Sequence, residues 1–545
     1  MNVSTKMPIH LQKRAWALNM GAFQAPALFL AVTALYAVTI NTTPVRVDEY
    51  YTLFAARSWA ADHGFAIVDG EYTRARLFTM LVGAAFGLFE DTSLLTARIP
   101  TVLTTAGLVT LLFVWVRGRA GVTAATIAAL VLALSGYTLD VAHFARFYAP
   151  QALAVLGAAI LVHAAAEKEG VALATRLAGA AALLALGFHL QPTTAIAGGA
   201  LAAWFAVQRL SWIRSALLRS PWLALAVGVS IVYFFFVILP PMVARFQGAS
   251  IWAQAHQYDH WFYLREFYNQ IPLILVLLPV AAVAALFRDR SLALLAIVMV
   301  AIALVMQSFA AMKAGRYFYY AMPFVALLFG LALARPMDMA IAAGKRALTG
   351  GGVPQELAGL CASVAIAIAG VGLLLVNSSY RHTAIALRQS VMELRDPLHV
   401  AQPADPVWDE AAPALRRMVL PDDFLVASDD LRTIAHIRPQ DMLINGSHLS
   451  DLRATADFTR DVRTGRPILA SVAGLDRMID CRTSGIVVVD DAHWRVAKGV
   501  PVAVADRIEQ RMSPVRPGVA HFRLFRWHHR PTASCPWMTA QGRAA

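Results

Sequence analysis

The sequence predicts a polytopic α-helical membrane protein that carries a small α/β domain at its C-terminal end. Of its 545 residues, 58% are hydrophobic and 15% are charged, and the mean hydropathy is +0.56. Soluble proteins carry about 25% charged residues. Long apolar runs fill the chain up to about residue 377, and a composition typical of soluble proteins follows. These observations place residues 1–377 in the membrane and residues 378–545 in a separate domain.

The membrane part is expected to contain about eleven spans, because its apolar runs approach or exceed the ~20 residues that cross a bilayer as a helix. These runs are residues 15–40, 99–116, 121–139, 150–166, 171–190, 193–208, 221–240, 271–287, 291–310, 319–334 and 357–377. The first run is too long for a signal-peptide core, so it is interpreted as an anchor.

Basic residues predict the orientation of these spans. The short loops around Arg117, Arg214, Arg288 and Lys345 all fall on one side if the chain alternates across the membrane. Cytoplasmic loops carry such an excess of Lys and Arg. The N-terminus is therefore expected in the cytoplasm. The pattern also accounts for the net charge of +13 through membrane orientation, so no nucleic-acid partner is expected.

The apolar run 77–89 tests this topology, because a crossing there would move every later loop to the other side. That arrangement would leave more Lys and Arg outside than inside. The run is also short for a span. It is therefore predicted to be a helix that lies in the outer membrane interface.

The outer loops hold the candidate functional residues. Asp48 and Glu49 follow the first span directly, and a carboxylate near lipid is costly and usually functional. Further acids, histidines, arginines and tyrosines occur in this loop and in three later ones, which suggests a composite active site. The alternatives are a solvated loop acid and, for the aromatic and arginine residues, helix-end anchoring. Arg74 and Arg76 in particular could bind a phosphate or extend toward lipid head groups.

The C-terminal region predicts a small α/β domain outside the membrane. Residues 423–428 and 485–490 look like buried strands, and amphipathic stretches such as 504–512 separate such runs. Cys481 and Cys535 are the two cysteines expected outside, where cysteines are seldom left free. We expect them to form a disulfide, although Cys535 lies in a tail that could fray. Cys361, inside the last span, is expected to be a packed apolar side chain.

An acid pair beside a basic surface fits group transfer from a lipid phosphate. One carboxylate can accept a proton from an attacking hydroxyl. Arginines and a bound metal ion can stabilise the departing phosphate.

Four segments resemble the GT-C membrane glycosyltransferases, within the branch similar to ArnT and the protein O-mannosyltransferases (glycosyltransferase family 39 or 83 type). They are Val47-Asp48-Glu49-Tyr50-Tyr51-Thr52, the stretch from Leu88 to Pro100, Phe144-Ala145-Arg146-Phe147-Tyr148-Ala149, and Gly315-Arg316-Tyr317 with the residues to Pro323. The order and spacing of these segments carry the resemblance, which covers residues 15–335.

The resemblance implies an inverting transfer from a polyprenyl-phosphate-linked sugar. It makes Asp48 the catalytic aspartate, with Glu49 beside it. The residues expected to bind the donor phosphate or substrate are Arg74, Arg76, Asp140, Arg146, Tyr148, Lys313, Arg316 and Tyr317. A divalent metal ion is a candidate cofactor, with Glu71 and either His256 or His260 as ligands.

The sequence departs from the resemblance before the interfacial run. Many members have a His-Pro-Pro segment there, whereas this chain has Glu71-Tyr72-Thr73-Arg74-Ala75-Arg76. The donor sugar therefore stays open.

The resemblance also implies a location and partners. The expected location is the bacterial inner membrane, with the C-terminal domain in the periplasm, and the expected partners are membrane lipids, the donor and an envelope acceptor. Lipid A, another glycan, a lipid or a protein would all suit as acceptor. The rival interpretations are a transporter or flippase for a lipid-linked substrate, and a sensor or scaffold. A transporter would place charges within broken helices.

Overall fold

The computed structural model describes residues 9–233, 236–237, 239–248, 256–393, 404–452, 457–461, 463–528, 530–531 and 535. The chain forms two compact units. Unit 1 comprises residues 1–42, 98–241 and 259–400, and unit 2 comprises residues 43–97, 242–258 and 401–545. The units do not follow the linear boundary at residue 377, because the first outer loop belongs to the same unit as the C-terminal domain.

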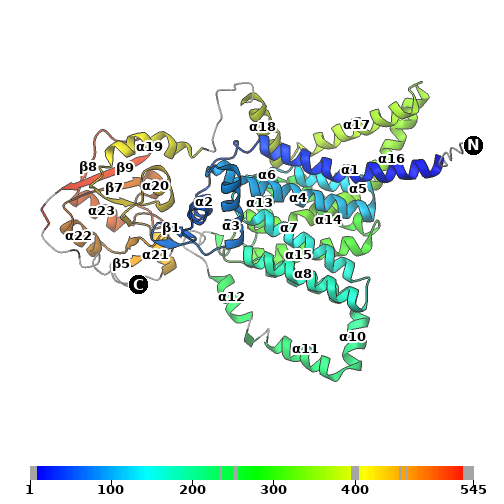
Figure 1. Cartoon of the computed structure of the whole chain (residues 1–545), viewed down its shortest axis with the longest axis horizontal. Coiled ribbons are helices and arrows are strands. Elements are labelled where there is room, and N and C mark those ends of the chain that lie inside the picture. Colours follow the sequence, from blue (N-terminus) through cyan, green and yellow to red (C-terminus); the bar gives the residue numbers. More distant parts are fainter. Residues whose placement is uncertain are drawn as a thin grey trace, which may run out of the picture. The chain divides into compact units, whose positions relative to one another are not determined.

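Unit 1 is helical throughout the residues described (Figure 1). Its helices, some of which begin or end in the neighbouring unit, are α1 (Ile9–Val38), α4 (Leu94–Ala120), α5 (Val122–Ala133), α6 (Gly136–Ala142), α7 (Tyr148–Ala165), α8 (Gly170–Leu190), α9 (Thr194–Gln208), α10 (Leu210–Arg219), α11 (Pro221–Tyr233), α12 (Leu239–Gln247), α13 (Phe262–Gln270), α14 (Pro272–Leu286), α15 (Arg290–Phe309), η3 (Gly315–Ala321), α16 (Met322–Gly350), α17 (Gln355–Leu374) and α18 (Ser378–Glu393).

Ten of the eleven expected spans coincide with a helix or a bent pair of helices. The other, 221–240, begins with α11, and its residues 234, 235 and 238 lie outside the described residues. Six described helices are long and apolar enough to cross a membrane, and two bent pairs raise this to 8. The others are short: the apolar part of α1 covers Phe23–Val38, α9 covers Thr194–Gln208, and α11 has 13 residues. The polytopic helical fold predicted from hydropathy is confirmed.

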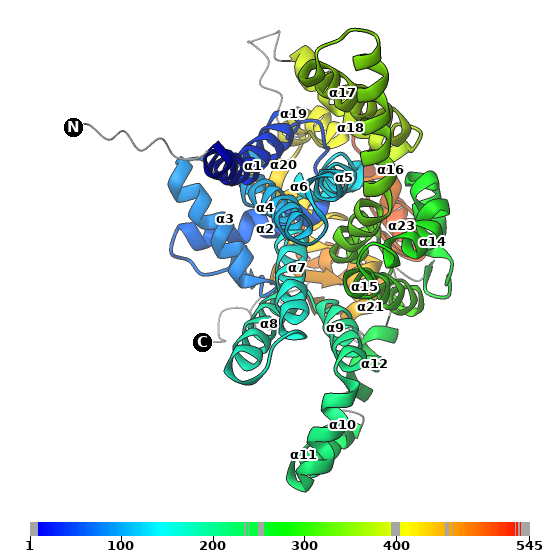
Figure 2. The same cartoon turned by 90° about the vertical axis from the view of Figure 1, so that its right-hand side faces the viewer.

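Small residues let these helices pack closely. In Figure 2, α7, α8 and α9 lie side by side, and each of the three contacts the other two. A Cβ at Gly330 of α16 would lie 2.5 Å from the carbonyl oxygen of Ala124 and 2.9 Å from the Cβ of Ala128 in α5. Close approach at small residues is how membrane helices gain packing contacts.

The expected span 121–139 is broken, because α5 and α6 meet at an angle of 66°. The hydroxyl of Ser379 in α18 accepts a hydrogen bond of 3.1 Å from the backbone N–H of Tyr137. A Cβ at Gly136 would lie 2.4 Å from the carbonyl oxygen of Ser379. In a straight helix the backbone N–H of Tyr137 would bond to a carbonyl of the same helix, whereas here it bonds to α18. This tertiary contact therefore stabilises the break between α5 and α6.

The orientation of the helices remains a prediction that fusions can test. Alkaline phosphatase fused after Tyr380 should be active, because the positive-inside pattern places this point outside. A fusion near Arg214 should be inactive, because the basic loop 209–219 is expected in the cytoplasm. Activity measured in intact cells decides this, and the opposite pair of results would invert the topology.

Unit 2 begins with the first outer loop, which forms α2 (Val47–Ala60), a hairpin of β1 (Ala66–Ile67) and β2 (Gly70–Glu71), and α3 (Arg76–Phe89). The helix α3 coincides with the expected interfacial helix. One face packs on α2, where a Cβ at Gly83 would lie 2.4 Å from the Trp59 ring. The exposed face is apolar and includes Leu81, Leu88 and Phe89. An apolar face left uncovered suits a helix lying in the membrane interface.

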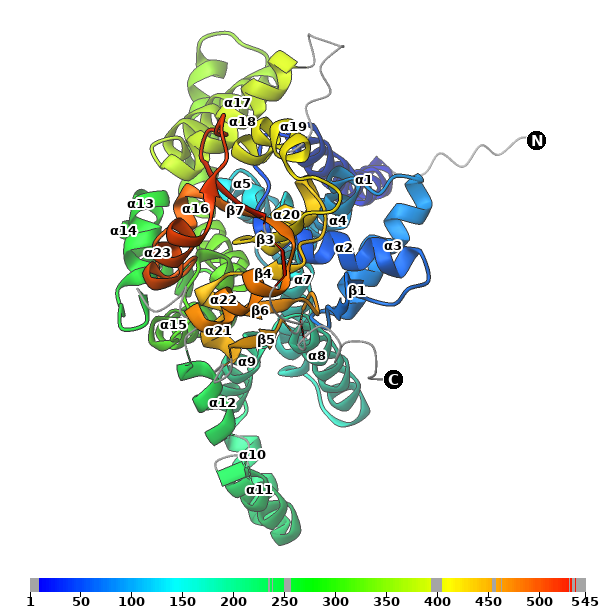
Figure 3. The ribbon, with the colours of Figure 1, turned by 90° about the vertical axis from the view of Figure 1, so that its left-hand side faces the viewer.

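The C-terminal part of unit 2 is a seven-stranded sheet in the order β5-β6-β4-β3-β7-β9-β8. The strands are β3 (Phe424–Ala427), β4 (Met442–Leu443), β5 (Phe458–Arg460), β6 (Pro467–Leu469), β7 (Ser484–Asp490), β8 (Ser513–Pro514) and β9 (Phe522–His528). β6, β4, β3 and β7 run parallel, and β5 and β9 are antiparallel to their neighbours. The central strands lie side by side in Figure 3.

Helices cover the sheet, so the predicted α/β architecture is confirmed. They are α19 (Pro406–Met418), α20 (Asp430–His436), α21 (Gly446–Leu452), α22 (Val472–Cys481), η4 (Asp491–His493) and α23 (Val502–Arg511). Alternate β7 residues enter two separate apolar clusters. Val487 and Val489 pack in one, and Ile486 and Val488 pack in the other. This alternation buries both faces of the strand.

The cysteines behave as expected in the C-terminal domain and differently in the last span. Cys481 and Cys535 form a disulfide with α-carbons 5.3 Å apart. It joins the end of α22 to a point 54 residues later. Cys361 in α17 is exposed on the helix surface, so the expectation that it is packed inside the protein is wrong. Its helix is apolar and could face lipid there.

Candidate active site

Asp48 and Glu49 stand in the first turn of α2, where they have different surroundings. The backbone N–H of Arg46 donates a hydrogen bond of 3.0 Å to Oε2 of Glu49, which is fully buried. Glu49 therefore helps to cap the helix, a structural role that its position three residues after the N-cap predicts. Asp48 is half-buried at the second helical position. The helix N-terminus favours its negative charge.

Other predicted residues of the first loop lie on its surface. Arg76 forms an ion pair of 2.8 Å with Glu71 and lies 5.5 Å from the Phe65 ring. Arg74 is exposed. Glu71 thus has a cationic partner of its own. A metal role for Glu71, like the phosphate role of the two arginines, stays a prediction.

The C-terminal domain holds α2 from several directions. The backbone N–H of Val45 donates to the Ala404 carbonyl at 3.0 Å. The Tyr50 hydroxyl lies 3.0 Å from Nε2 of His436. The Arg463 guanidinium lies 5.2 Å from the centre of the Tyr51 ring, a cation–π distance. The helix that carries Asp48 is therefore positioned by residues almost 400 positions later in the chain, because the Tyr50–His436 pair spans 386 residues.

The hairpin of the first loop also docks on the C-terminal domain. The backbone N–H of Asp69 donates to the Thr464 carbonyl at 3.0 Å. Oδ2 of Asp69 lies 3.2 Å from Nε of Arg466. Gly465 has a φ of +70°, and a Cβ there would lie 2.4 Å from the Asp69 carbonyl carbon. This glycine is needed both for its backbone conformation and for the close approach of two backbones.

Replacement of Gly465 by alanine should therefore undock the hairpin. We expect it to destabilise unit 2 by about 1–3 kcal/mol more than Gly64→Ala does. Gly64 is the matched control, because its φ is +67° and no described atom lies within 4 Å of its Cβ position. Thermal unfolding and proteolysis of the first loop measure the difference. Equal effects in the two variants would mean that the docking contributes nothing.

Acids gather at the carboxyl ends of the parallel strands, a feature that the sequence analysis missed. Asp429 and Asp430 follow β3, and Asp490 ends β7. The signal was present, because an acid pair stands at or just after the end of each strand, Asp429-Asp430 after β3 and Asp490-Asp491 at the end of β7. In parallel sheets, ligands bind at this edge. Two groups there could hold a metal ion, Asp429 with Asp490 and His493, and Asp430 with His448 and Asp461.

In unit 1, Arg316 is placed by aromatic side chains from two loops. Its Nε donates to the Tyr148 hydroxyl at 3.3 Å. Its guanidinium lies 5.8 Å from the Phe144 ring and 5.6 Å from the Tyr317 ring. Three residues predicted from the sequence, Tyr148, Arg316 and Tyr317, thus come together although they lie in different loops. Such a frame limits the rotamers of the guanidinium, which suits a group that must meet a phosphate in one orientation.

The segment before Arg316 is held by tyrosines. The Tyr263 hydroxyl donates to the Ala314 carbonyl at 3.1 Å, and the Tyr137 hydroxyl donates to the Gly315 carbonyl. Nζ of Lys313 donates to the Ala310 carbonyl at 2.5 Å. Lys313 is buried. This burial lowers the pKa of its ammonium group and outweighs the opposite effect of Asp259.

The second outer loop supplies one buried arginine and one accessible acid. Arg146 is buried, and its guanidinium lies 4.8 Å from the Phe147 ring. Oδ1 of Asp140 lies 3.7 Å from Nε2 of His382 in α18. Sequence reasoning did not identify His382, because α18 lies beyond the expected catalytic region. His260 is close to a backbone carbonyl, with Nδ1 3.2 Å from the Ser308 oxygen, and His256 is exposed. Their metal role stays a prediction.

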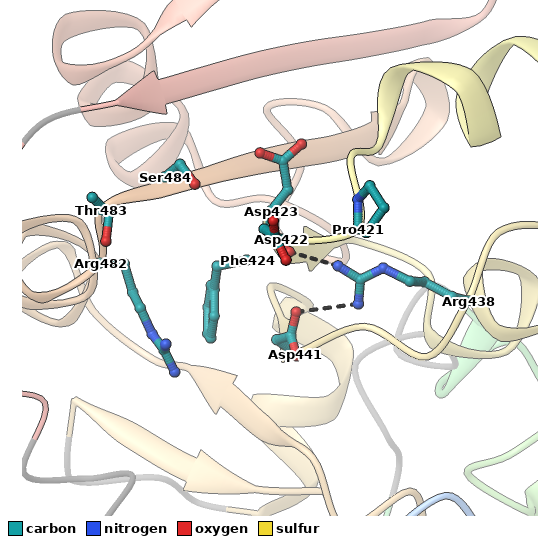
Figure 4. A pocket seen from close by; sticks show the side chains of 9 residues that line it. All are labelled: Pro421, Asp422, Asp423, Phe424, Arg438, Asp441, Arg482, Thr483 and Ser484. Carbon is teal, nitrogen blue, oxygen red and sulfur yellow. Dashed lines mark hydrogen bonds and ion pairs between the residues drawn. The ribbon is translucent and has the colours of Figure 1, made fainter.

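Two hollows lie away from these groups. One, of about 690 Å³, lies at α13 and the start of α14, where Trp261 and Tyr268 line it together with the polar Arg265 and Asn269. Aromatic and arginine side chains of this kind are expected of helix-end anchors. The other, of about 250 Å³, lies at the amino ends of β3 and β7 (Figure 4). Its Arg438 pairs with Asp441 at 3.3 Å and with the Asp423 carbonyl at 2.6 Å. The charges of this second hollow are thus partly satisfied within it.

Comparison with known proteins identifies the fold. The sequence matches no protein-family model and no curated protein. The structure is similar to ArnT from Cupriavidus metallidurans bound to undecaprenyl phosphate, with a TM-score of 0.56 and 16% identity over 92% of this chain and 97% of that one. It is also similar to the archaeal oligosaccharyltransferase AglB from Archaeoglobus fulgidus in complex with an inhibitory peptide and a dolichol-phosphate, with a TM-score of 0.55 and 13% identity over 86% of this chain and 70% of that one. The chain has the GT-C fold that the sequence motifs implied.

Proposed function

We propose that the protein is an inverting glycosyltransferase that moves a sugar from a polyprenyl-phosphate carrier to an acceptor of the bacterial cell envelope. The observation that carries the proposal is Arg316, held against Tyr148 by aromatic rings at the ends of apolar helices. This is a built cationic position in a chain with the fold of a protein bound to undecaprenyl phosphate. Arginine suits such a site because its planar donors match a phosphate.

In the proposed reaction, Asp48 accepts the proton of an acceptor hydroxyl as that oxygen forms a bond to the anomeric carbon. The bond between this carbon and the phosphate oxygen breaks on the opposite face, so the configuration inverts. The products are a glycoside and polyprenyl phosphate, and the proton passes from Asp48 to water. Asp48 suits the role of base because it is a half-buried carboxylate in the first turn of α2, and a positioned carboxylate can accept a proton.

Arg316 and Arg146 stabilise the negative charge that develops on the phosphate as it leaves. Groups held in place before the reaction do so without reorganisation. The frame of Phe144, Tyr148 and Tyr317 provides this preorganisation for Arg316, and burial against Phe147 provides it for Arg146. The location proposed is the bacterial inner membrane, with the chemistry at its outer face.

The test is transfer by the purified full chain in lipid nanodiscs, supplied with a synthetic polyprenyl-phosphate sugar. The measured quantity is polyprenyl phosphate released in the presence of envelope extract as acceptor. A transporter or flippase would move the labelled lipid between the leaflets of liposomes without releasing polyprenyl phosphate. That result would overturn the proposal. If polyprenyl phosphate is released, mass spectrometry of envelope glycolipids and glycoproteins from a deletion strain would identify the acceptor.

A further inference from the structure

We propose that Asp430, His448 and Asp461 of the C-terminal domain form a binding site for a divalent metal ion. One ligand atom from each of the three residues lies within 4.8 Å of the others. Asp430 follows β3, His448 belongs to α21, and Asp461 follows β5. The site lies beside Tyr51 of the first outer loop, and it is separate from the metal ligands that the sequence suggested.

Asp430 provides the observation that points to a ligand. Its side chain is only 4% exposed, and its Oδ2 has no hydrogen-bond partner among the residues that the structure describes. A buried carboxylate oxygen without a partner is costly. A bound cation would offset that cost directly. Asp430 therefore offers a buried carboxylate oxygen that a bound cation would coordinate.

The second group at this edge, Asp429 with Asp490 and His493, is complete without an ion. Oδ1 of Asp429 accepts from the Arg432 backbone at 3.0 Å, and its Oδ2 accepts from Nη1 of Arg432 at 3.0 Å. Oδ1 of Asp490 accepts from the His493 backbone at 2.9 Å, and its Oδ2 lies 2.7 Å from Nδ1 of His493. All four carboxylate oxygens thus have partners. The contrast with Asp430 selects the first group and makes the second a matched control.

Arg463 is the positive group next to the proposed site. Its Nη2 lies 2.6 Å from Nδ1 and 2.9 Å from Nε2 of His448, and its Nε donates to Oδ1 of Asp461 at 3.2 Å. A guanidinium only donates, so a ring nitrogen that accepts from Arg463 does so through the lone pair that a metal ion would use. A bound ion would coordinate Asp461, which would keep its hydrogen bond to Arg463. At His448 the ion would replace the guanidinium of Arg463.

The donor set favours a particular class of ion. One imidazole and two carboxylates suit Zn²⁺ or Mn²⁺, whereas Mg²⁺ and Ca²⁺ prefer oxygen ligands alone. Because Arg463 also lies against Tyr51, occupation of the site would change the contact between the C-terminal domain and α2. The proposal does not depend on the transferase activity, since metal binding is measured by itself.

The experiment is isothermal titration calorimetry and thermal unfolding of the chelator-treated full chain with ZnCl₂, MnCl₂, MgCl₂ and CaCl₂. We expect one Zn²⁺ or Mn²⁺ to bind per chain and to raise Tm. Asp430→Asn should weaken binding by at least about 100-fold. Without metal, its Tm should be equal to or above that of the wild type, because a buried charge without a partner is removed. This last result separates a lost ligand from a misfolded variant.

The matched control is Asp490→Asn, which should leave the affinity for the ion unchanged. Three results would overturn the proposal. They are no binding by the wild type, equal binding by the wild type and Asp430→Asn, and loss of binding in Asp490→Asn while Asp430→Asn still binds. Failure of the transferase assay would leave these binding results unaffected, so the two proposals can fail separately.

Discussion

Replacement of Asp48 by asparagine should lower the rate of sugar transfer by about 10²–10⁴-fold, the range expected when a positioned general base is removed. Asparagine keeps the size of the side chain and its place in the first turn of α2, but it cannot accept the proton. The helix should still form, because Glu49 keeps its hydrogen bond to the Arg46 backbone. The initial rate of polyprenyl phosphate release at saturating donor measures the effect.

The control for this variant is Asp62→Asn, in the same loop. Asp62 is exposed and has a φ of 60°, a conformation that asparagine tolerates. Asp62→Asn should therefore retain wild-type rate and Tm. Near wild-type transfer by Asp48→Asn, with the same Tm, would remove Asp48 from the mechanism. Glu49→Gln tests the second acid separately, because glutamine can still accept the hydrogen bond that caps the helix. If this variant changes Tm but not the transfer rate, Glu49 has a structural role only.

Replacement of Arg316 by alanine should cost about 10²–10³-fold in turnover, as expected when one preorganised stabilising group is lost. Arg316→Lys keeps the charge but loses the planar pair of donors, so it should restore only part of the rate. Arg146→Ala should show a comparable loss or a higher apparent KM for the donor. Donor-dependent kinetics of the three variants measure these effects.

Arg265→Ala is the matched control for the arginine variants. Arg265 is an exposed arginine of α13 in the same unit, and it pairs with Asp259. Exposed ion pairs contribute at most about 1 kcal/mol, so this variant should keep the donor kinetics of the wild type. Unchanged kinetics in both Arg146→Ala and Arg316→Ala would leave these arginines only the role of anchoring helix ends.

The sequence alone determined the membrane class, the helices that coincide with the spans, the apolar helix of the first loop and the disulfide partners. These follow from local properties. A run of apolar residues must be helical in lipid whatever its neighbours are, because its backbone has no other hydrogen-bond partners there. Short, continuous apolar runs likewise revealed β3 and β7. The motif around Arg316 was recognisable because Tyr317 and the residues up to Pro323 follow it directly in the sequence.

Only the tertiary structure decided how distant segments combine. The break before Asp140 depends on Ser379, which is 244 residues from Ser135. The support of α2 depends on His436 and Arg463, and the docking of its hairpin depends on Gly465. No local pattern encodes such contacts, because they are backbone and side-chain pairs between segments whose spacing in the sequence is arbitrary. For the same reason the sequence did not predict the site at Asp430. Its buried oxygen becomes a candidate ligand only because the fold brings His448 and Asp461 close to it.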